Sequence, residues 1–151
     1  MVVMSELARP HRFYEVVHGV YFDDLDAFQV LHNARYLVFF ERTVGAFWRQ
    51  LGFTPTLDPA ANPDQFQLVR ANHIDYLRAV RGVCDVRVRV WVEKLGRTSA
   101  VFGCSMMPLD EDVAYATGQR VLVRVDPSTM RPTPWTEDFR KRLLPFVRQA
   151  A

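Results

Sequence analysis

The segment 84–92 constrains the fold of this 151-residue chain most strongly, because apolar and mostly polar residues alternate along it without a break. One set of alternate positions carries Cys84, Val86, Val88, Val90 and Val92. The positions between them carry Asp85, Arg87, Arg89 and Trp91. Side chains in a β-strand point alternately to the two faces of a sheet, so this pattern predicts a strand with one buried face. The residues 93–97 that follow predict a hairpin turn.

Further strand-like segments lie on both sides of this one. Residues 12–22 are rich in β-branched and aromatic side chains, and short gaps separate the strand-like ranges 66–78, 98–107 and 113–126. Parallel neighbours need crossover connections of a dozen or more residues, which most of these gaps are too short to provide. We therefore expect a mostly antiparallel sheet.

One long helix is predicted over residues 33–51. Asn33 offers an oxygen suited to an N-cap, and Gly52 can supply the left-handed conformation at which helices often end. The apolar residues 36–40 are consecutive, so they point in every direction around the helix axis and need cover on most sides. We expect the sheet to curve around this helix in an α+β fold. A short C-terminal helix is predicted after Thr136, a second suitable N-cap.

Size and charge narrow the functional classes. A chain of 151 residues with 49% hydrophobic content can build one core, so we expect a single domain over residues 1–151. A net charge of +2 lacks the basic excess typical of nucleic-acid binding. No signal-peptide pattern or membrane-length apolar stretch occurs, which predicts a cytoplasmic protein without membrane contact. Cys84 and Cys104 lack metal-ligand or redox spacing, so we expect free thiols and no metal or cofactor.

A distinctive motif lies between the first strand and the long helix. It reads Asp24-Leu25-Asp26-Ala27-Phe28-Gln29-Val30-Leu31-His32-Asn33-Ala34-Arg35-Tyr36 and continues to Phe40-Glu41-Arg42. This motif resembles the signature of the 4-hydroxybenzoyl-CoA thioesterase family, which commonly reads D-x-D-x-x-G-H-V-N-N-A-x-Y and is followed by a helix bearing a glutamate. The spacing agrees at Asp24, Asp26, Asn33, Ala34, Tyr36 and Glu41. The ranges 75–99 and 121–134 are also similar to that family, so the resemblance covers most of the chain.

The resemblance implies a hot-dog fold, in which a five-stranded antiparallel sheet wraps around a long central helix. It also implies a homodimer with a continuous sheet, or a homotetramer. The implied activity is hydrolysis of an acyl-CoA to a free acid and CoA, with coenzyme A as part of the substrate. Asp26 would be the nucleophile or the general base, and the Asn33 N–H at the helix start would stabilise the oxyanion. Without the resemblance, acids at this position would indicate only a turn and a helix cap.

Supporting roles are predicted for further residues of the motif, namely Asp24, His32 and Glu41. Substrate-binding candidates are Phe28, Tyr36, Arg78 and Arg97, because CoA phosphates need cations at a pocket mouth and an acyl group needs apolar walls. Each of them also fits an ordinary structural role in a turn, a core or a solvated surface.

Three alternative functions remain beside acyl-CoA hydrolysis. The motif departs from its commonest form at Gln29, where Gly is usual, and at Val30, where many members have His. These departures fit a non-catalytic acyl-CoA-binding protein with a degraded site. An acyl-carrier-protein thioesterase and a dehydratase of the same fold are the other two. The sequence leaves the acyl group open, as well as the choice between nucleophilic and general-base catalysis.

Overall fold

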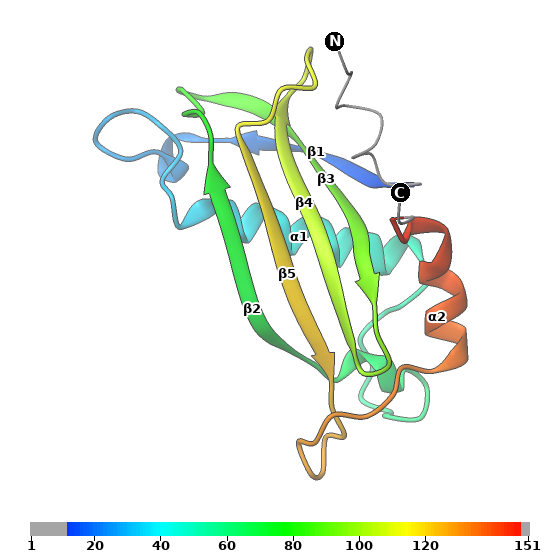
Figure 1. Ribbon diagram of the computed structural model, residues 1–151. Coiled ribbons are helices and arrows are strands. Elements are labelled where there is room, and N and C mark those ends of the chain that lie inside the picture. Colours follow the sequence, from blue (N-terminus) through cyan, green and yellow to red (C-terminus); the bar gives the residue numbers. More distant parts are fainter. Residues whose placement is uncertain (1–11, 149–151) are drawn as a thin grey trace.

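The sheet of this protein is antiparallel throughout in the computed structural model, which describes residues 12–148. Its five strands are β1 (Tyr14–Val20), β2 (Gln67–Tyr76), β3 (Cys84–Leu95), β4 (Ser99–Pro108) and β5 (Ala116–Arg124). Their order across the sheet is β1-β3-β4-β5-β2, so β1 and β2 are the edges (Figure 1). The predicted five-stranded antiparallel sheet is confirmed, with strand ends shifted by a few residues.

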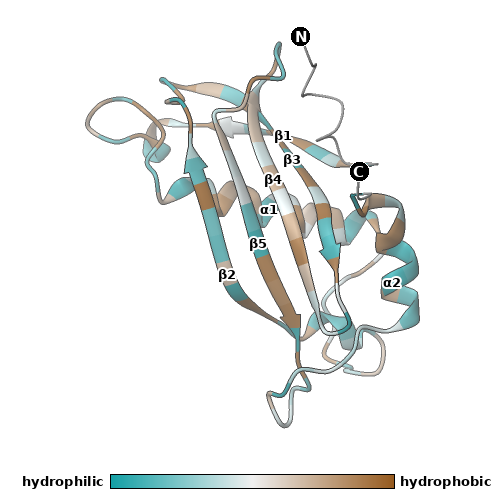
Figure 2. Cartoon of the chain, in the orientation of Figure 1, coloured by the Kyte–Doolittle hydropathy of each residue, from teal (hydrophilic) through white to brown (hydrophobic). Residues whose placement is uncertain are grey.

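Helix α1 (Arg35–Gln50) connects the β1 side of the molecule to the loop that precedes β2 and packs against one face of the sheet (Figure 1). The alternate valines of β3 are fully buried on that face. Phe47 of α1 is also fully buried, and its ring centroid lies 6.4 Å from that of Phe102 in β4. Figure 2 shows hydrophobic and hydrophilic residues alternating along α1, as expected for a helix with one buried face.

The side of α1 that faces away from the sheet is exposed, whereas the sequence predicted that the helix would be covered on most sides. Arg35, Arg42 and Arg49 are exposed there, and Val38 between them is 37% exposed. Within one chain the sheet therefore covers one side of this helix, and the predicted central position of the helix stays a prediction.

The prediction that Asn33 caps α1 is wrong. The N-cap position is Ala34, and no side chain of that residue caps the helix. His32 satisfies the neighbouring amides instead, because the Ala34 N–H donates to His32 Nδ1 at 3.1 Å and the Arg35 N–H donates to the His32 carbonyl at 2.9 Å. At the other end of the helix, Gly52 has the predicted left-handed conformation, with a φ of 86°.

The short C-terminal helix α2 (Glu137–Leu143) is confirmed, together with its cap. The Thr136 hydroxyl accepts a hydrogen bond from the Phe139 N–H at 3.2 Å. Phe139 is buried, and its ring stacks on that of Trp135 at a centroid distance of 4.2 Å. Helix α2 thus covers the core at the end of α1 that is farthest from the motif (Figure 1).

Candidate active site

A cleft of about 410 Å³ lies where the β1–α1 connection meets the end of β2. Its lining residues are Asp26, Val30, Leu31, Asn33, Tyr36, Tyr76, Leu77, Arg78 and Ala79. In Figure 1 this region lies at the left, where the loop before α1 approaches the tip of the β2 arrow. The structure therefore brings together four residues that the sequence singled out: Asp26, Asn33, Tyr36 and Arg78.

The loop before α1 forms a tight turn around Asp26. Asp26 Oδ1 accepts hydrogen bonds from the Phe28 N–H at 2.8 Å and from the Val30 N–H at 3.4 Å. The Asp26 N–H donates to the Val30 carbonyl at 2.9 Å, which closes the turn. Asp26 Oδ2 has no hydrogen-bond partner within residues 12–148. One carboxylate oxygen is therefore held by the backbone, and the other remains available for chemistry in the cleft.

Gln29 occupies the position where the family usually has Gly. Its φ is 61°, in the left-handed region that residues with a Cβ adopt at a cost of roughly 1–2 kcal/mol. The Gln29 carbonyl accepts a hydrogen bond from the Gly82 N–H at 2.9 Å, and the Leu31 N–H donates to the Val80 carbonyl at 2.9 Å. These bonds dock the loop on the segment after β2, so the turn keeps a conformation that suits Gly although Gln stands there.

Asn33, one of the residues that line the cleft, has an unpaired backbone donor among the described residues. Its N–H has no protein acceptor within residues 12–148, whereas the next two amides of the chain both donate to His32. The start of a helix also carries a partial positive charge, which favours an anion beside it. The Asn33 carbonyl is held from outside the turn, because the Tyr76 hydroxyl donates to it at 3.0 Å.

Two tyrosines meet in the wall of the cleft. The rings of Tyr36 and Tyr76 are nearly perpendicular, with centroids 5.0 Å apart. Burial raises the pKa of the Tyr36 phenol, and the nearby Asp26 carboxylate adds to this rise, so Tyr36 stays neutral at physiological pH. Tyr76 was missed as a site residue by sequence reasoning. Its signal was its place in the segment 75–78, which resembles the family.

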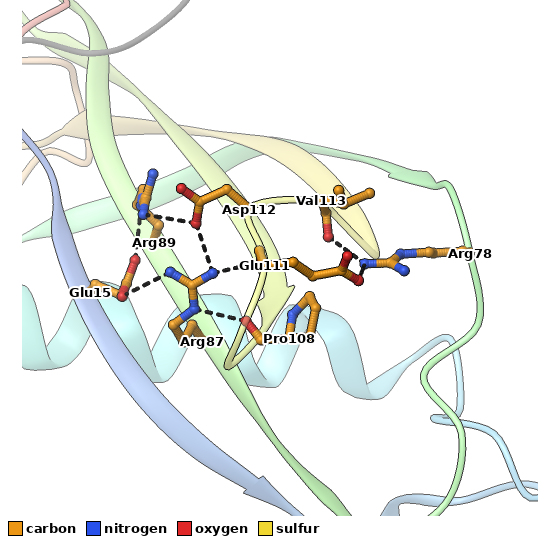
Figure 3. Close-up of polar contacts among 8 residues, drawn as sticks. All are labelled: Glu15, Arg78, Arg87, Arg89, Pro108, Glu111, Asp112 and Val113. Carbon is orange, nitrogen blue, oxygen red and sulfur yellow. Dashed lines mark hydrogen bonds and ion pairs between the residues drawn. The ribbon is translucent and has the colours of Figure 1, made fainter. Parts of the chain in front are cut away.

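Arg78 is held at the rim of the cleft by the loop between β4 and β5. Its Nη2 donates to Glu111 Oε1 at 2.8 Å and to the Val113 carbonyl at 2.7 Å (Figure 3). Its guanidinium carbon lies 4.6 Å from the centroid of the Tyr115 ring. Arg78 Nη1 and Nε have no hydrogen-bond partner in the described part of the chain. The side chain is thus fixed through one nitrogen while its other donors stay available.

The same loop is anchored to the sheet by Arg87 of β3. Arg87 Nε donates to the Pro108 carbonyl at 2.8 Å, and its Nη2 donates to the Glu111 carbonyl at 2.7 Å and to Asp112 Oδ1 at 2.8 Å (Figure 3). The hydrogen bond to Asp112 raises the pKa of Arg87, and Glu15 adds to this rise. Glu111 thus connects Arg87 on the sheet with Arg78 at the cleft.

The remaining acidic candidates lie outside the cleft. Asp24 Oδ2 accepts a hydrogen bond from the Tyr21 N–H at 2.9 Å, and its Oδ1 lies 3.9 Å from Arg35 Nε. Glu41 is exposed on α1, where its Oε1 lies 3.0 Å from Arg120 Nη2. Both carboxylates therefore take part in structural contacts, and neither residue is among those that line the cleft.

Three further candidates are also not brought into the cleft. His32 is exposed and is occupied with the amides at the start of α1. Phe28 is 85% exposed, and Phe22 before it is 77% exposed rather than part of the predicted first strand. Arg97 lies in the β3–β4 turn, where its carbonyl accepts a hydrogen bond from the Trp135 N–H at 3.0 Å. That turn joins the ends of β3 and β4 at the opposite end of the sheet from the cleft.

Two other hollows, of about 140 and 470 Å³, lie between the loop after α1 and helix α2. Asp64 is the buried carboxylate in both walls. It accepts hydrogen bonds from the Thr136 N–H at 3.0 Å and from the Thr136 hydroxyl at 2.6 Å, and it lies 3.5 Å from Arg124 Nε. Because these partners occupy its carboxylate, we locate the candidate chemistry at the Asp26 cleft.

The described part of the chain contains neither a metal-binding cluster nor a membrane-spanning helix. Among residues 12–148, no group of three or more His, Cys, Asp or Glu side chains has the arrangement needed to hold a metal ion. In the same range, no helix has both the length and the apolar content needed to span a bilayer. The expectation that the protein needs no metal or cofactor stays a prediction.

Comparison with family models gives the class of the protein. Residues 28–115 match the model of the Thioesterase superfamily. This match covers more than half of the chain, and the chain belongs to the thioesterase superfamily. The class of thioester-hydrolysing enzymes predicted from the motif is thereby confirmed. The match begins at Phe28, so Asp24 and Asp26 lie just before the matched residues. Comparison with curated protein sequences gives no significant match.

Solved structures share the fold over most of the chain. A predicted thioesterase from Bacillus stearothermophilus is 24% identical, with a TM-score of 0.78 over 93% of this chain and 100% of that chain. A 1,4-dihydroxy-2-naphthoyl-CoA thioesterase from Synechocystis is 10% identical, with a TM-score of 0.76 over 88% and 96%. A Staphylococcus aureus protein in complex with CoA is 14% identical, with a TM-score of 0.77 over 89% and 84%. At these identities the likeness shows a common hot-dog fold.

Proposed function

We propose that this protein hydrolyses an acyl-CoA thioester to a free acid and CoA in the Asp26 cleft. One observation carries the proposal: Asp26 and Asn33 line the same cleft, and neither Asp26 Oδ2 nor the Asn33 N–H is engaged by another group of the described chain. A thioester is already an activated acyl group, so one positioned carboxylate and one oxyanion donor suffice for its hydrolysis.

Two routes use these groups with the same balance of atoms. In the first, Asp26 Oδ2 attacks the thioester carbonyl carbon, the C–S bond breaks, and water then hydrolyses the acyl-aspartyl anhydride. In the second, Asp26 takes a proton from a water molecule whose oxygen attacks the same carbon, and the tetrahedral intermediate collapses with breakage of the C–S bond. In both routes the carbonyl oxygen becomes an oxyanion that accepts a hydrogen bond from the Asn33 N–H, and the departing thiolate takes up a proton.

Arg78 is the cation that we assign to the anionic part of CoA. Its Nη1 and Nε remain available at the rim of the cleft, and a guanidinium binds phosphate through short, charge-assisted hydrogen bonds. The complex of the related Staphylococcus aureus protein with CoA supports this substrate class. The cleft walls near Asp26 also include Val30, Leu31 and Leu77, which suit an apolar acyl group.

We further propose that two copies of the chain pair through β2 to form a homodimer, which a homotetramer would also contain. β2 is an edge strand that pairs only with β5 among the described strands. Leu68 and Val69 in it are each 45% exposed. A long exposed edge with apolar side chains is a template for pairing with another chain. Pairing at β2 would bring the partner's surface beside Tyr76 at the cleft.

The function is tested by measuring thiol release from aromatic, short-chain and long-chain acyl-CoAs with a chromogenic thiol reagent. An acylated carrier protein serves as the comparison substrate, and the protein without substrate as the blank. We expect release from at least one acyl-CoA class at a rate well above that of the blank. Tight acyl-CoA binding without any thiol release would contradict the proposal and favour a binding protein. Release from the carrier protein alone would move the assignment to a carrier-protein thioesterase.

A further inference from the structure

We propose that Tyr76 is a positioning residue that aims the Asn33 N–H at the thioester oxygen. This inference rests on the function proposed above and adds a residue from the far edge of the sheet to the site. Tyr76 ends β2, 43 positions after Asn33, and its hydroxyl donates to the Asn33 carbonyl at 3.0 Å. Both residues line the cleft.

The other bonds around the Asn33 N–H all come from the local turn. The Ala34 and Arg35 amides donate to the ring and to the carbonyl of His32, and they leave the Asn33 N–H unused among the described residues. Asn33 and Ala34 are both exposed, so packing does little to restrain the peptide between them. The Tyr76 hydroxyl therefore connects the Asn33–Ala34 peptide to the rigid sheet. This peptide shares the Asn33 Cα with the His32–Asn33 peptide, which carries the Asn33 N–H, so holding the one restrains the other.

Tyr76 is well anchored for this task. Its backbone pairs with Ala116 of β5, and the Leu77 and Arg78 amides that follow it both donate to the Tyr115 carbonyl, at 2.9 and 3.1 Å. Its ring packs edge-on against the buried ring of Tyr36. Groups carried by strands hold their positions more precisely than groups carried by loops. The hydroxyl therefore transfers the rigidity of β2 to the start of α1.

A hydrogen bond to its carbonyl also polarises the His32–Asn33 peptide, which makes its N–H a stronger donor. Its carbonyl oxygen accepts the Arg35 N–H at 2.9 Å, and its N–H is the donor that faces no other acceptor in the described chain. Hydrogen bonds in series polarise one another, which strengthens the terminal donor. An oxyanion donor works only where it meets the developing charge, so its orientation matters as much as its presence. Tyr76 acts on this orientation through the neighbouring Asn33–Ala34 peptide, whose carbonyl it binds.

The test compares Tyr76→Phe with Tyr14→Phe in thiol-release assays. The phenylalanine ring of the Tyr76→Phe variant would retain the contact with Tyr36 and lose only the hydrogen bond to Asn33. We expect kcat to fall about tenfold with KM nearly unchanged, a smaller loss than the ~10²-fold or more that follows removal of an oxyanion donor itself. Tyr14 packs on Phe47, and its hydroxyl has no partner within residues 12–148, so Tyr14→Phe should keep the wild-type kcat.

Other outcomes would overturn the inference. An unchanged kcat in Tyr76→Phe, with active wild type, refutes the positioning role and leaves the proposed function intact. A raised KM with an unchanged kcat would show that the hydroxyl contacts the substrate instead. An inactive wild type refutes the proposed function itself. A second measurement combines Tyr76→Phe with Asn33→Pro, which lacks the N–H: once the donor is gone, Tyr76→Phe should cost no further activity, and a full additional tenfold loss would contradict the role.

Discussion

Backbone amides rather than charged side chains set the geometry around Asp26. Two N–H groups hold one of its oxygens, and the pairing of the loop with the segment after β2 holds those amides in place. The site therefore depends on the conformation of a few loop residues. Substitutions that change this conformation should affect the site more than substitutions that change nearby charges.

Gln29 offers a direct test of the loop conformation. Its φ of 61° suits Gly and opposes a β-branched side chain. We expect Gln29→Gly to keep the free energy of unfolding within about 1 kcal/mol of wild type, because relief of strain offsets the added chain entropy. Gln29→Val should lower it by more than about 1 kcal/mol. Urea unfolding measures both, and equal stability of the two variants would contradict the assigned conformation.

Arg78 tests the assignment of the CoA end of the substrate. Arg78→Met keeps the apolar stem and removes the charge, so we expect KM for acyl-CoA to rise about tenfold, as for the loss of a charge-assisted hydrogen bond. The change in kcat should be small. Arg49→Met, on the exposed side of α1, is the matched control and should leave KM unchanged. Equal KM values for wild type and Arg78→Met would remove Arg78 from the binding site.

At the scale of secondary-structure elements, strands were more predictable than helix ends. The period of two in β3 reports directly on a buried face, and the structure buries all four of its valines. The start of α1 was misplaced because His32, a residue outside the usual capping set, takes the Ala34 and Arg35 amides, and Arg35 is one of the two amides that an Asn33 cap could have bound. Tyr76 escaped notice as a site residue because its bond to Asn33 joins segments that only the folded sheet brings together.

The contact between β1 and α1 contains a pH-dependent element. His18 Nε2 lies 2.8 Å from the Thr43 hydroxyl, which itself donates to the Phe39 carbonyl, so a neutral His18 donates to Thr43. Burial lowers the pKa of His18 below its usual 6.5, and Arg42 lowers it further. His18 therefore binds a proton more readily in the unfolded chain than in the folded chain. The free energy of unfolding falls as the pH drops below about 6.5, the pKa of an ordinary histidine.

His18→Gln removes this titration. We expect the free energy of unfolding of wild type to decrease more than that of His18→Gln between pH 7.5 and pH 5.5, as measured by urea unfolding at several pH values. His73→Gln is the control, since His73 is exposed on β2. Parallel pH profiles for wild type and His18→Gln would contradict the assignment.

At the scale of the whole molecule, the proposed pairing of two copies through β2 would cover the exposed edge of the sheet. Sedimentation velocity should give a dimer or a tetramer of this chain at micromolar concentration. Leu68→Lys places like charges at the proposed edge, so it should shift the protein toward monomer and lower kcat, because Tyr76 lies at the end of the same strand. A wild-type protein that is monomeric and fully active would contradict the proposed pairing of two copies through β2.

The measurement that tests the central claim most directly is the kcat for thiol release by Asp26→Asn beside Asp24→Asn, on the best acyl-CoA substrate of the wild type. Both changes replace one carboxylate by an amide in the same loop, but only Asp26 lines the cleft. We predict a loss of at least ~10²-fold for Asp26→Asn and a kcat near wild type for Asp24→Asn, with unchanged thermal unfolding. Equal activity in wild type and Asp26→Asn would contradict the account, and a selective loss in Asp24→Asn would transfer the chemistry to Asp24.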